Sequence, residues 1–178
     1  MSDDSLLTGF EPCHRFDFFE PEDLTALVCL DVPQMQRLVI DQLSGLGYKI
    51  HTGMFLEDSI LKIRAHEYDV IVVSEHFNGS QLENHPILEE VNRIPLVQRR
   101  RQCIVLIGAS LTTNDELQAF GCSVDIVISL ADLGNLKPVL RRGVNRAAAF
   151  YAPLQEALVA HQSTDNHRPV GRTTAPAH

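Results

Sequence analysis

The stretch Asp69-Val70-Ile71-Val72-Val73-Ser74 places four consecutive β-branched residues between two polar ones. β-branched side chains favour strands, and a strand that is apolar at every position is typical of a parallel sheet covered on both faces. Two other stretches are apolar throughout in the same way: Ala26-Leu27-Val28-Cys29-Leu30 and Cys103-Ile104-Val105-Leu106-Ile107. These three stretches predict the central strands of a parallel sheet.

Shorter segments around them complete an alternation of strands and helices. Two more strands are predicted at 48–51 and 124–128, and helices at 33–47, 57–63, 86–93, 113–121 and 135–161. Pro33 suits the first position of a helix and Gly47 suits a helix end, while Thr113 to Glu116 has the pattern of a capping box. This alternation predicts an α/β fold, a doubly wound five-stranded parallel sheet with right-handed crossovers and an extended C-terminal helix.

The two ends of the chain depart from this alternation. Residues 1–23 are rich in Asp, Glu and Pro, which is typical of an irregular leader, and the leader's phenylalanines are candidates for packing against the domain. Residues 161–178 are polar and contain proline, which predicts a disordered tail. The α/β domain is therefore expected at 24–160.

The charge of the chain limits what it can bind. A net charge of −8 and a pI near 5.4 argue against nucleic acid, because binding it requires clustered Lys and Arg. The short basic cluster Arg99-Arg100-Arg101 is expected at a solvated helix end or in pairs with nearby acids. No stretch has the roughly 18 apolar residues of a membrane span. The acidic N-terminus also lacks the pattern of a secretion signal.

The four cysteines show no CxxC pairing. Cys29 and Cys103 fall inside apolar strands, where a free thiol behaves as a small buried hydrophobe. Cys13-His14 has no second ligand pair at a suitable spacing, so we expect no metal there. This cysteine usage predicts a reducing compartment, the cytoplasm.

The order of these features resembles the receiver domain of two-component response regulators over residues 24–150. That family begins with an apolar strand, two acids, any residue and proline, where this chain has Leu30-Asp31-Val32-Pro33. Gly47-Tyr48 matches the family's turn into the second strand, and Gly121-Cys122 matches its Gly-Ala pair before the fifth. The resemblance implies the flavodoxin-like strand order 2-1-3-4-5 and a site at the carboxyl ends of the strands.

The resemblance also implies a phosphorylation pocket, and this chain differs at the residues of that pocket. Phosphotransfer needs a carboxylate nucleophile, a divalent cation held by acidic oxygens, and a cation and a hydroxyl on the transferred oxygens. The corresponding positions hold Ser74 (nucleophile), Leu30 and Asp31 (metal acids), Gly108 (hydroxyl) and Ser129 or Leu130 (lysine). We therefore expect a degenerate pseudo-receiver that is not an enzyme, has no metal or cofactor, and has a packed or loop-covered pocket around Ser74.

Glu75, beside the missing phosphoacceptor, has two interpretations. Neighbouring residues of a strand point to opposite faces, so the favoured interpretation is a solvated loop carboxylate. The alternative is a permanent negative charge that imitates the phosphorylated state, which would require a local bend. The scattered histidines are expected singly in loops or on the surface, among them His51, His66, His76 and His85.

The last helix carries one continuous apolar stripe at spacings of three and four: Leu136, Leu140, Gly143/Val144, Ala147, Tyr151, Leu154 and Leu158. From 135 to 161 it would be about 40 Å long, roughly twice what a five-stranded sheet requires. Either Pro153 breaks the helix and the remainder folds back, or the overhang pairs with another helix.

The candidate interaction surface comprises Ala147, Tyr151, Leu154 and Leu158, together with the face of the fourth helix and fifth strand. The expected function is a signalling or protein-interaction module that binds a protein partner or a second copy of the chain. The alternative is a small α/β ligand-binding domain or enzyme that uses the carboxyl ends of the strands.

Overall fold

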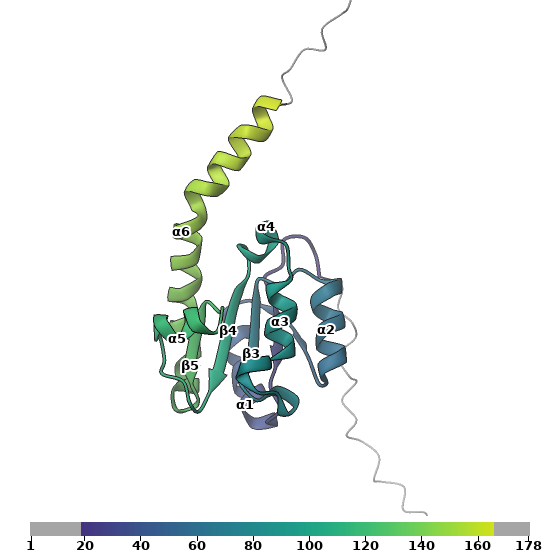
Figure 1. Ribbon diagram of the computed structural model, residues 1–178, viewed down its shortest axis with the longest axis vertical. Coiled ribbons are helices and arrows are strands. Elements are labelled where there is room, and N and C mark those ends of the chain that lie inside the picture. Colours follow the sequence, from purple (N-terminus) through teal and green to yellow (C-terminus); the bar gives the residue numbers. More distant parts are fainter. Residues whose placement is uncertain (1–18, 166–178) are drawn as a thin grey trace, which may run out of the picture.

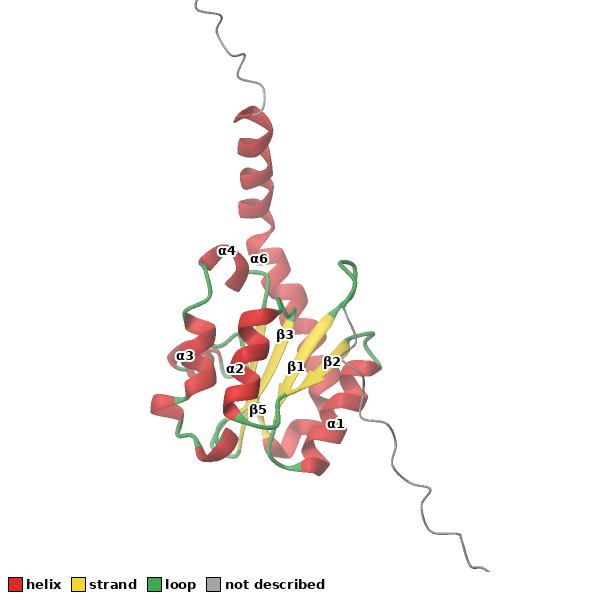
Figure 2. Cartoon of the chain, turned by 90° about the vertical axis from the view of Figure 1, so that its right-hand side faces the viewer, coloured by secondary structure: helices red, strands yellow, loops and turns green. Residues whose placement is uncertain are grey.

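The computed structural model of the protein describes residues 19–165, with side chains up to Pro153 other than those of 148 and 150. Its five strands form one sheet in the order β2-β1-β3-β4-β5, and every pair is parallel. They are β1 (Thr25–Cys29), β2 (Lys49–Thr52), β3 (Val70–Ser74), β4 (Cys103–Gly108) and β5 (Ile126–Ser129). The predicted fold class and strand order are confirmed (Figure 2).

Helices cover both faces of the sheet (Figure 1). One face carries α1 (Pro33–Ser44) and α6 (Leu136–Asp165), and the other carries α2 (Leu56–Ala65), α3 (Pro86–Asn92) and α5 (Glu116–Gly121). The short α4 (Leu96–Arg99) precedes β4, and 3-10 turns occupy Phe77–Gly79, Leu82–Asn84 and Leu130–Asn135. The crossovers therefore place helices on both sides of a central layer.

The central strands divide the core into two halves. Along β1, Ala26 and Val28 pack towards α1 and α6, while Leu27 and Cys29 pack towards α2 and α3. Strands β3 and β4 alternate in the same way, so both faces of the sheet are sealed by apolar side chains. The Cys29 and Cys103 thiols are free and buried as predicted, and burial raises the pKa of each to about 12.

One helix was not predicted, and one local prediction is wrong. Helix α4 was not expected, because four residues after Pro95 are too few to show a helical period. The capping box at Thr113 does not form: Asp115 caps α5 by accepting hydrogen bonds from the backbone N–H groups of Leu117 and Gln118. The Thr113 hydroxyl instead accepts a hydrogen bond from the Ser129 N–H at the end of β5.

Helix α6 continues through Pro153 to Asp165, so the alternative in which Pro153 ends the helix is wrong. Its 30 residues give a length of about 45 Å. Figures 1 and 2 show its second half projecting beyond the amino ends of the strands, away from the rest of the domain. The expected start of the tail at residue 161 falls inside this helix, and residues 166–178 lie outside the described part.

The last residues of the leader contact the domain. The Phe19 ring lies 4.2 Å from the His51 ring and within 6.0 Å of the His66 and Tyr68 rings, measured between centroids. His51 Nδ1 is in turn 2.8 Å from the Tyr68 hydroxyl. Phe19 therefore anchors the chain beside β2, while residues 1–18, with the other leader phenylalanines, lie outside the described range.

No helix between residues 19 and 165 combines the length and the apolar character that a membrane crossing would need.

Helix α6 packs closely on β5 at Gly143. A Cβ atom at this position would lie 2.2 Å from Ile126 Cδ1 and 2.8 Å from its Cγ1, and Ile126 is buried. We expect Gly143→Ala to lower the free energy of unfolding by about 1–3 kcal/mol, because the overpacked side chain outweighs alanine's better helix propensity. Chemical denaturation measures the change.

Gly121→Ala is the matched control, because a Cβ there meets no atom within 4 Å. It should leave the stability unchanged or slightly higher. A Gly143→Ala protein as stable as the original would show that α6 does not pack closely on β5.

Candidate functional site

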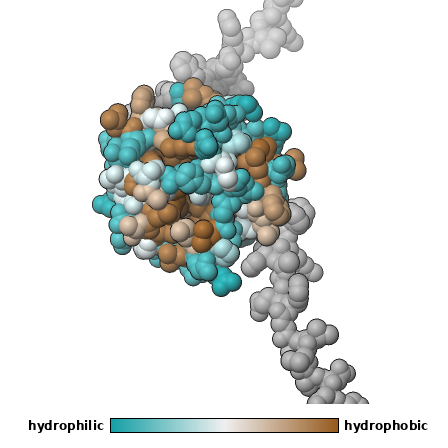
Figure 3. All heavy atoms as spheres, turned by 60° about the horizontal axis from the view of Figure 1, so that its bottom comes forward, coloured by the Kyte–Doolittle hydropathy of each residue, from teal (hydrophilic) through white to brown (hydrophobic). Residues whose placement is uncertain are grey.

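The five residues of the predicted pocket come together at the carboxyl edge of the sheet. Ser74 ends β3, and the register pairs Gly108 of β4 with Ser129 of β5. Cys29 pairs with Val73, so Leu30 and Asp31 follow β1 beside the end of β3. Figure 3 views the molecule from this side, and its surface mixes polar and apolar areas. Exposed apolar side chains of the loops at this edge are Val32, Met54 and Phe55.

The first strand contributes one carboxylate, and a neighbouring loop holds it. Asp31 Oδ1 and Oδ2 both accept from the backbone N–H of Asn78, at 3.0 and 3.1 Å, and Oδ1 also accepts from Asn78 Nδ2 at 3.2 Å. Asn78 adopts a left-handed conformation, with φ of 52°, in the turn after β3. Leu30 is buried in the core. Asp31 is therefore an exposed carboxylate bound to a loop.

Glu75 is the main polar feature of this edge, and its prediction as a solvated loop carboxylate is wrong. The residue is 4% exposed. Its carboxylate accepts from the Ala109 N–H at 2.6 Å, the Ser110 hydroxyl at 2.5 Å and the Ser110 N–H at 3.4 Å. The Glu75 N–H donates to the Ile107 carbonyl at 2.8 Å. The side chain is thus bound to the loop that follows β4.

Gly108 makes room for this arrangement. A Cβ atom at position 108 would lie 2.3 Å from the Glu75 carboxyl carbon and 2.3 and 2.7 Å from its two oxygens. The carboxylate therefore occupies the space where a side chain of residue 108 would project. A strand-four residue with a hydroxyl side chain would displace Glu75.

The hydrogen bonds determine the ionisation of Glu75. Burial alone would raise its pKa, but the Ser110 hydroxyl and the N–H groups of Ala109 and Ser110 stabilise the charged form and hold the pKa below its usual value. The nearby His76 imidazole, 3.8 Å from Glu75 Oε1, acts in the same direction. Glu75 is therefore an anion at neutral pH.

Ser74 lacks the surroundings of an activated nucleophile. Its hydroxyl accepts a long hydrogen bond of 3.4 Å from the His76 N–H. His85 Nε2 lies 3.0 Å from the Ser74 carbonyl rather than its hydroxyl, so this nitrogen donates. Among the described side chains, no carboxylate or imidazole is hydrogen-bonded to the Ser74 hydroxyl, so nothing there serves as its general base.

The prediction of single loop or surface histidines is wrong for three of them: the His51 and His66 rings lie 5.4 Å apart, with His51 in β2, and His85 is buried. Burial lowers its pKa, so the imidazole is neutral at pH 7. Its position at the start of α3, bonded to the end of β3, gives it a structural role.

Hydroxyl groups and a helical turn occupy the end of β5. The Ser129 N–H donates to Thr113 Oγ1 at 3.0 Å, and the Thr113 hydroxyl donates to Asp132 at 2.6 Å. Leu130 packs against the core. The position implied for a lysine therefore supplies no cation to this edge.

These residues do not fit a divalent cation. Asp31 uses both oxygens to accept N–H groups, Leu30 offers no oxygen ligand, and Glu75 is turned towards Ala109 and Ser110. Across residues 19–165, no group of three or more His, Cys, Asp or Glu side chains has an arrangement that could hold a metal ion.

The structure places part of the candidate interaction surface. Ala147 and Tyr151 are half-buried, and the Arg100 guanidinium carbon lies 5.9 Å from the centre of the Tyr151 ring. Helix α6 includes Leu154 and Leu158, but their side chains are outside the described ones.

Helix α5 corresponds to the predicted fourth helix, at 113–121. Two of its residues were not identified from the sequence as part of an exposed apolar face: Leu117 is 80% and Phe120 is 82% exposed. Two apolar residues spaced three apart lie on one face of a helix, and this spacing could have identified them from the sequence. An ion pair between Glu116 and Arg146 joins α5 to α6, although the two helices cover opposite faces of the sheet. The basic cluster next to it is partly paired with acid, as expected, because Arg99 bonds Asp125 at 2.9 Å.

Comparison with known proteins supports the fold. No protein-family model and no curated protein sequence matches the chain. Among solved structures, it is similar to the chemotaxis response regulator CheY4 of Vibrio cholerae, with 15% identity and a TM-score of 0.56, over 68% of this chain and 98% of that one. A putative response regulator from Chloroflexus aurantiacus has 16% identity and a TM-score of 0.56, over 71% of this chain and 99% of that one.

A third similar structure is the receiver domain of the sensor histidine kinase PA1611 from Pseudomonas aeruginosa, which has a magnesium ion coordinated in its active-site cleft. It has 17% identity and a TM-score of 0.54, over 69% of this chain and 98% of that one. In each case nearly the whole of the other chain is matched. The protein therefore has the receiver fold, with a long helix in addition.

Proposed function

We propose that this protein is a non-catalytic, receiver-like signalling module of the cytoplasm that acts through protein contacts and is not phosphorylated at the carboxyl edge of its sheet. The observation that carries the proposal is the position of Glu75. Its carboxylate accepts the hydrogen bonds that the β4 loop has available for an anion, from Ala109 and Ser110.

The electrostatics of this edge support the same conclusion. A phosphoryl group on residue 74 would bring about two negative charges next to the buried Glu75 anion, and like charges at short range in a poorly solvated site repel strongly. The edge offers no lysine at Ser129 to relieve that repulsion, and Leu30 leaves Asp31 without the second acid with which it could hold a divalent cation. Glu75 instead holds the β4 loop permanently around an internal negative charge.

The interaction surface we propose lies on α5 and α6. It combines Leu117 and Phe120 with Ala147 and Tyr151, and the sequence continues its apolar stripe through Leu154 and Leu158. Isolated helices of this length are marginal in water, so the projecting half of α6 gains stability from a partner. Spacings of three and four from residue 144 to 158 suit a second copy of the same helix.

We expect no incorporation of phosphate when the chain is incubated with acetyl phosphate and Mg²⁺, because the nucleophile, the cation site and the free anion donors are all missing. Ser74→Asp alone should also remain unmodified, since Glu75 still occupies the donors of Ala109 and Ser110. Intact-protein mass spectrometry measures the modification, with an active receiver domain as the positive control. A phosphoryl adduct on either protein would contradict the proposal.

Glu75 should make a pH-dependent contribution to stability. Because its folded pKa is lowered, its contribution is present above the unfolded pKa of about 4.3 and is lost as the pH falls through the folded pKa. We expect Glu75→Gln to lower the free energy of unfolding by about 1–3 kcal/mol at pH 7 and by less at acidic pH. Urea denaturation at several pH values measures both differences.

Glu83→Gln, an exposed side chain in the 3-10 turn before α3, is the control and should change little at any pH. If Glu75→Gln has the same effect as Glu83→Gln at pH 7, the Glu75 carboxylate is not held as described.

Self-association should depend on the α5–α6 surface. We expect the full chain to form a dimer, and the double variant Leu117→Ser/Phe120→Ser and a chain lacking residues 153–178 to be monomers of unchanged fold. Because exposed side chains contribute little to the stability of the monomer, the melting temperature of the double variant should be unchanged. Light scattering with analytical ultracentrifugation gives the masses.

Met54→Ser/Leu61→Ser removes two other exposed apolar side chains, which lie outside the proposed surface, and should leave the dimer intact. A full chain that stays monomeric at high concentration would rule out self-association. A deletion that unfolds the domain would show that the end of α6 is part of the core.

A further inference from the structure

Two apolar side chains of α4 are exposed beside the place where α6 leaves the domain. Leu96 is 62% and Val97 is 60% exposed. Arg100, at the end of α4, holds its guanidinium carbon 5.9 Å from the centre of the Tyr151 ring of α6. Figures 1 and 2 both show α4 next to this part of α6. Leu96, Val97 and Tyr151, which we call the α4 patch, therefore lie together at the amino end of the sheet.

The apolar stripe of α6 lies on the side of the helix that faces the domain. Its first members, Leu136 and Leu140, are fully buried against the sheet. Tyr151 continues the stripe at the α4 patch, and the helical backbone places Leu158 on the same face two turns later. The sheet and α4 therefore occupy the stripe side of α6 as far as Tyr151. Beyond it, the stripe continues along about 20 Å of projecting helix.

The position of the domain restricts how a second α6 can pack against this stripe. In a parallel pair, the two sheets would lie at the same end of the helices, and each sheet would lie on the stripe side of its own helix. Both sheets would then meet in the space between the helices. In an antiparallel pair, the two sheets lie at opposite ends, and only the projecting halves overlap. The stripe therefore accepts a second α6 in the antiparallel direction.

The charges of α6 favour the same direction. From Lys137 to Arg146 the helix has four basic residues and no acidic one, and from Leu154 to Asp165 it has two acidic residues and no Lys or Arg. The C-terminal end of a helix also carries a partial negative charge. An antiparallel pair brings the acidic end of each helix towards the basic part of the other, whereas a parallel pair places like charges side by side.

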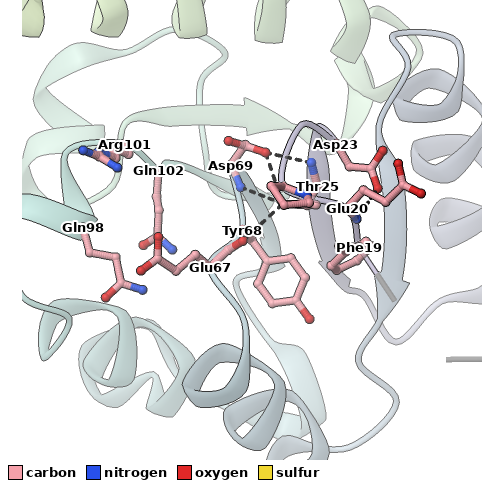
Figure 4. A pocket seen from close by; sticks show the side chains of 11 residues that line it. Phe19, Glu20, Asp23, Thr25, Glu67, Tyr68, Asp69, Gln98, Arg101 and Gln102 are labelled. Carbon is pink, nitrogen blue, oxygen red and sulfur yellow. Dashed lines mark hydrogen bonds between the residues drawn. The ribbon is translucent and has the colours of Figure 1, made fainter. Parts of the chain in front are cut away.

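The segment that follows α4 adds positive charge to this basic part. Arg101 is exposed and has no hydrogen bond or ion pair with another described residue. Figure 4 shows its side chain on the same side of the pocket at the amino ends of the strands as Gln98 of α4. The α4 patch therefore combines exposed apolar side chains with a neighbouring positive charge, and such a surface suits an apolar helix that ends in an acid.

We propose that the α4 patch receives the end of a second copy's α6, with the two helices antiparallel. Pairing Leu154 with the partner's Leu158 brings Tyr151 level with the partner's His161. The last turns of the partner's α6 then lie on the α4 patch. Because the pair has two-fold symmetry, each copy contributes both the patch and the helix end. The inference rests on the self-association proposed above, and it adds α4 and the direction of the helices.

Disulfide cross-linking of the full chain tests the direction. Cys13→Ser and Cys122→Ser leave only the buried native thiols. In this background, oxidation of Val97→Cys/His161→Cys should give a covalent dimer linked between positions 97 and 161, and neither single variant should cross-link. The two positions cannot be joined within one chain, because residue 161 lies about 15 Å beyond Tyr151 and a disulfide needs Cα atoms within about 7 Å. Non-reducing electrophoresis and peptide mass spectrometry identify the link.

Leu96→Ser/Val97→Ser tests the patch in a chain with its native cysteines. It should weaken the dimer about tenfold or more in analytical ultracentrifugation, because it removes apolar contacts with the partner's helix. The melting temperature of the monomer should be unchanged, since both side chains are exposed. Met54→Ser/Leu61→Ser, at positions of similar exposure, is the matched control and should leave the dissociation constant unchanged. This experiment remains decisive if the cysteine variants do not fold.

The possible failures can be told apart. A covalent dimer from His161→Cys alone would show parallel helices, and an unlinked Val97→Cys/His161→Cys dimer or an undiminished Leu96→Ser/Val97→Ser dimer would show that α4 is not covered. Each of these results overturns the inference and leaves the proposed self-association standing. A full chain that is monomeric in light scattering would overturn both.

Discussion

The burial of β1, β3 and β4 on both faces is the constraint on which the rest of the structure depends. Helices close the sheet from two sides, so the side chains inside these strands are apolar and their backbone groups pair within the sheet. Polar chemistry is thereby confined to the two ends of the strands. The two ends differ: at the carboxyl end Glu75 is hydrogen-bonded to the β4 loop, and at the amino end the Gln102 amide is buried without a hydrogen-bond partner among the described residues.

At the carboxyl end, two departures from the receiver pattern are physically one feature. The Glu75 carboxylate can reach the N–H groups of Ala109 and Ser110 because Gly108 has no side chain. A hydroxyl residue at 108 and a buried carboxylate at 75 exclude each other on steric grounds. The absence of a side chain at position 108 is thus the condition for this arrangement, in which the β4 loop binds the Glu75 carboxylate.

The sequence was sufficient to predict the strands of the sheet, because β-branched and apolar runs such as Val70–Val73 are typical of strands buried on both faces. It also identified which loops meet at the carboxyl edge, since the ends of parallel strands share one side. It was not sufficient for Glu75, because alternation along a strand predicts a side chain on the opposite face, and the chain bends after Ser74. The prediction of the α5 cap was wrong for a similar reason. The Thr113 hydroxyl is hydrogen-bonded to Ser129 and Asp132, which are distant in sequence, and so does not cap the helix. The Gln102 amide could not be foreseen, because an unpaired group is defined by what surrounds it in space.

The amino end of the sheet lies next to the projecting helix. In the segment that leads into β4, the Arg100 guanidinium lies against the Tyr151 ring of α6. Tyr151 stands where α6 leaves the domain and continues towards Asp165. The Arg100–Tyr151 contact therefore ties the segment that precedes β4 to the place where α6 leaves the domain. Because β4 continues from this segment into the loop that holds Glu75, one strand connects the two ends of the sheet.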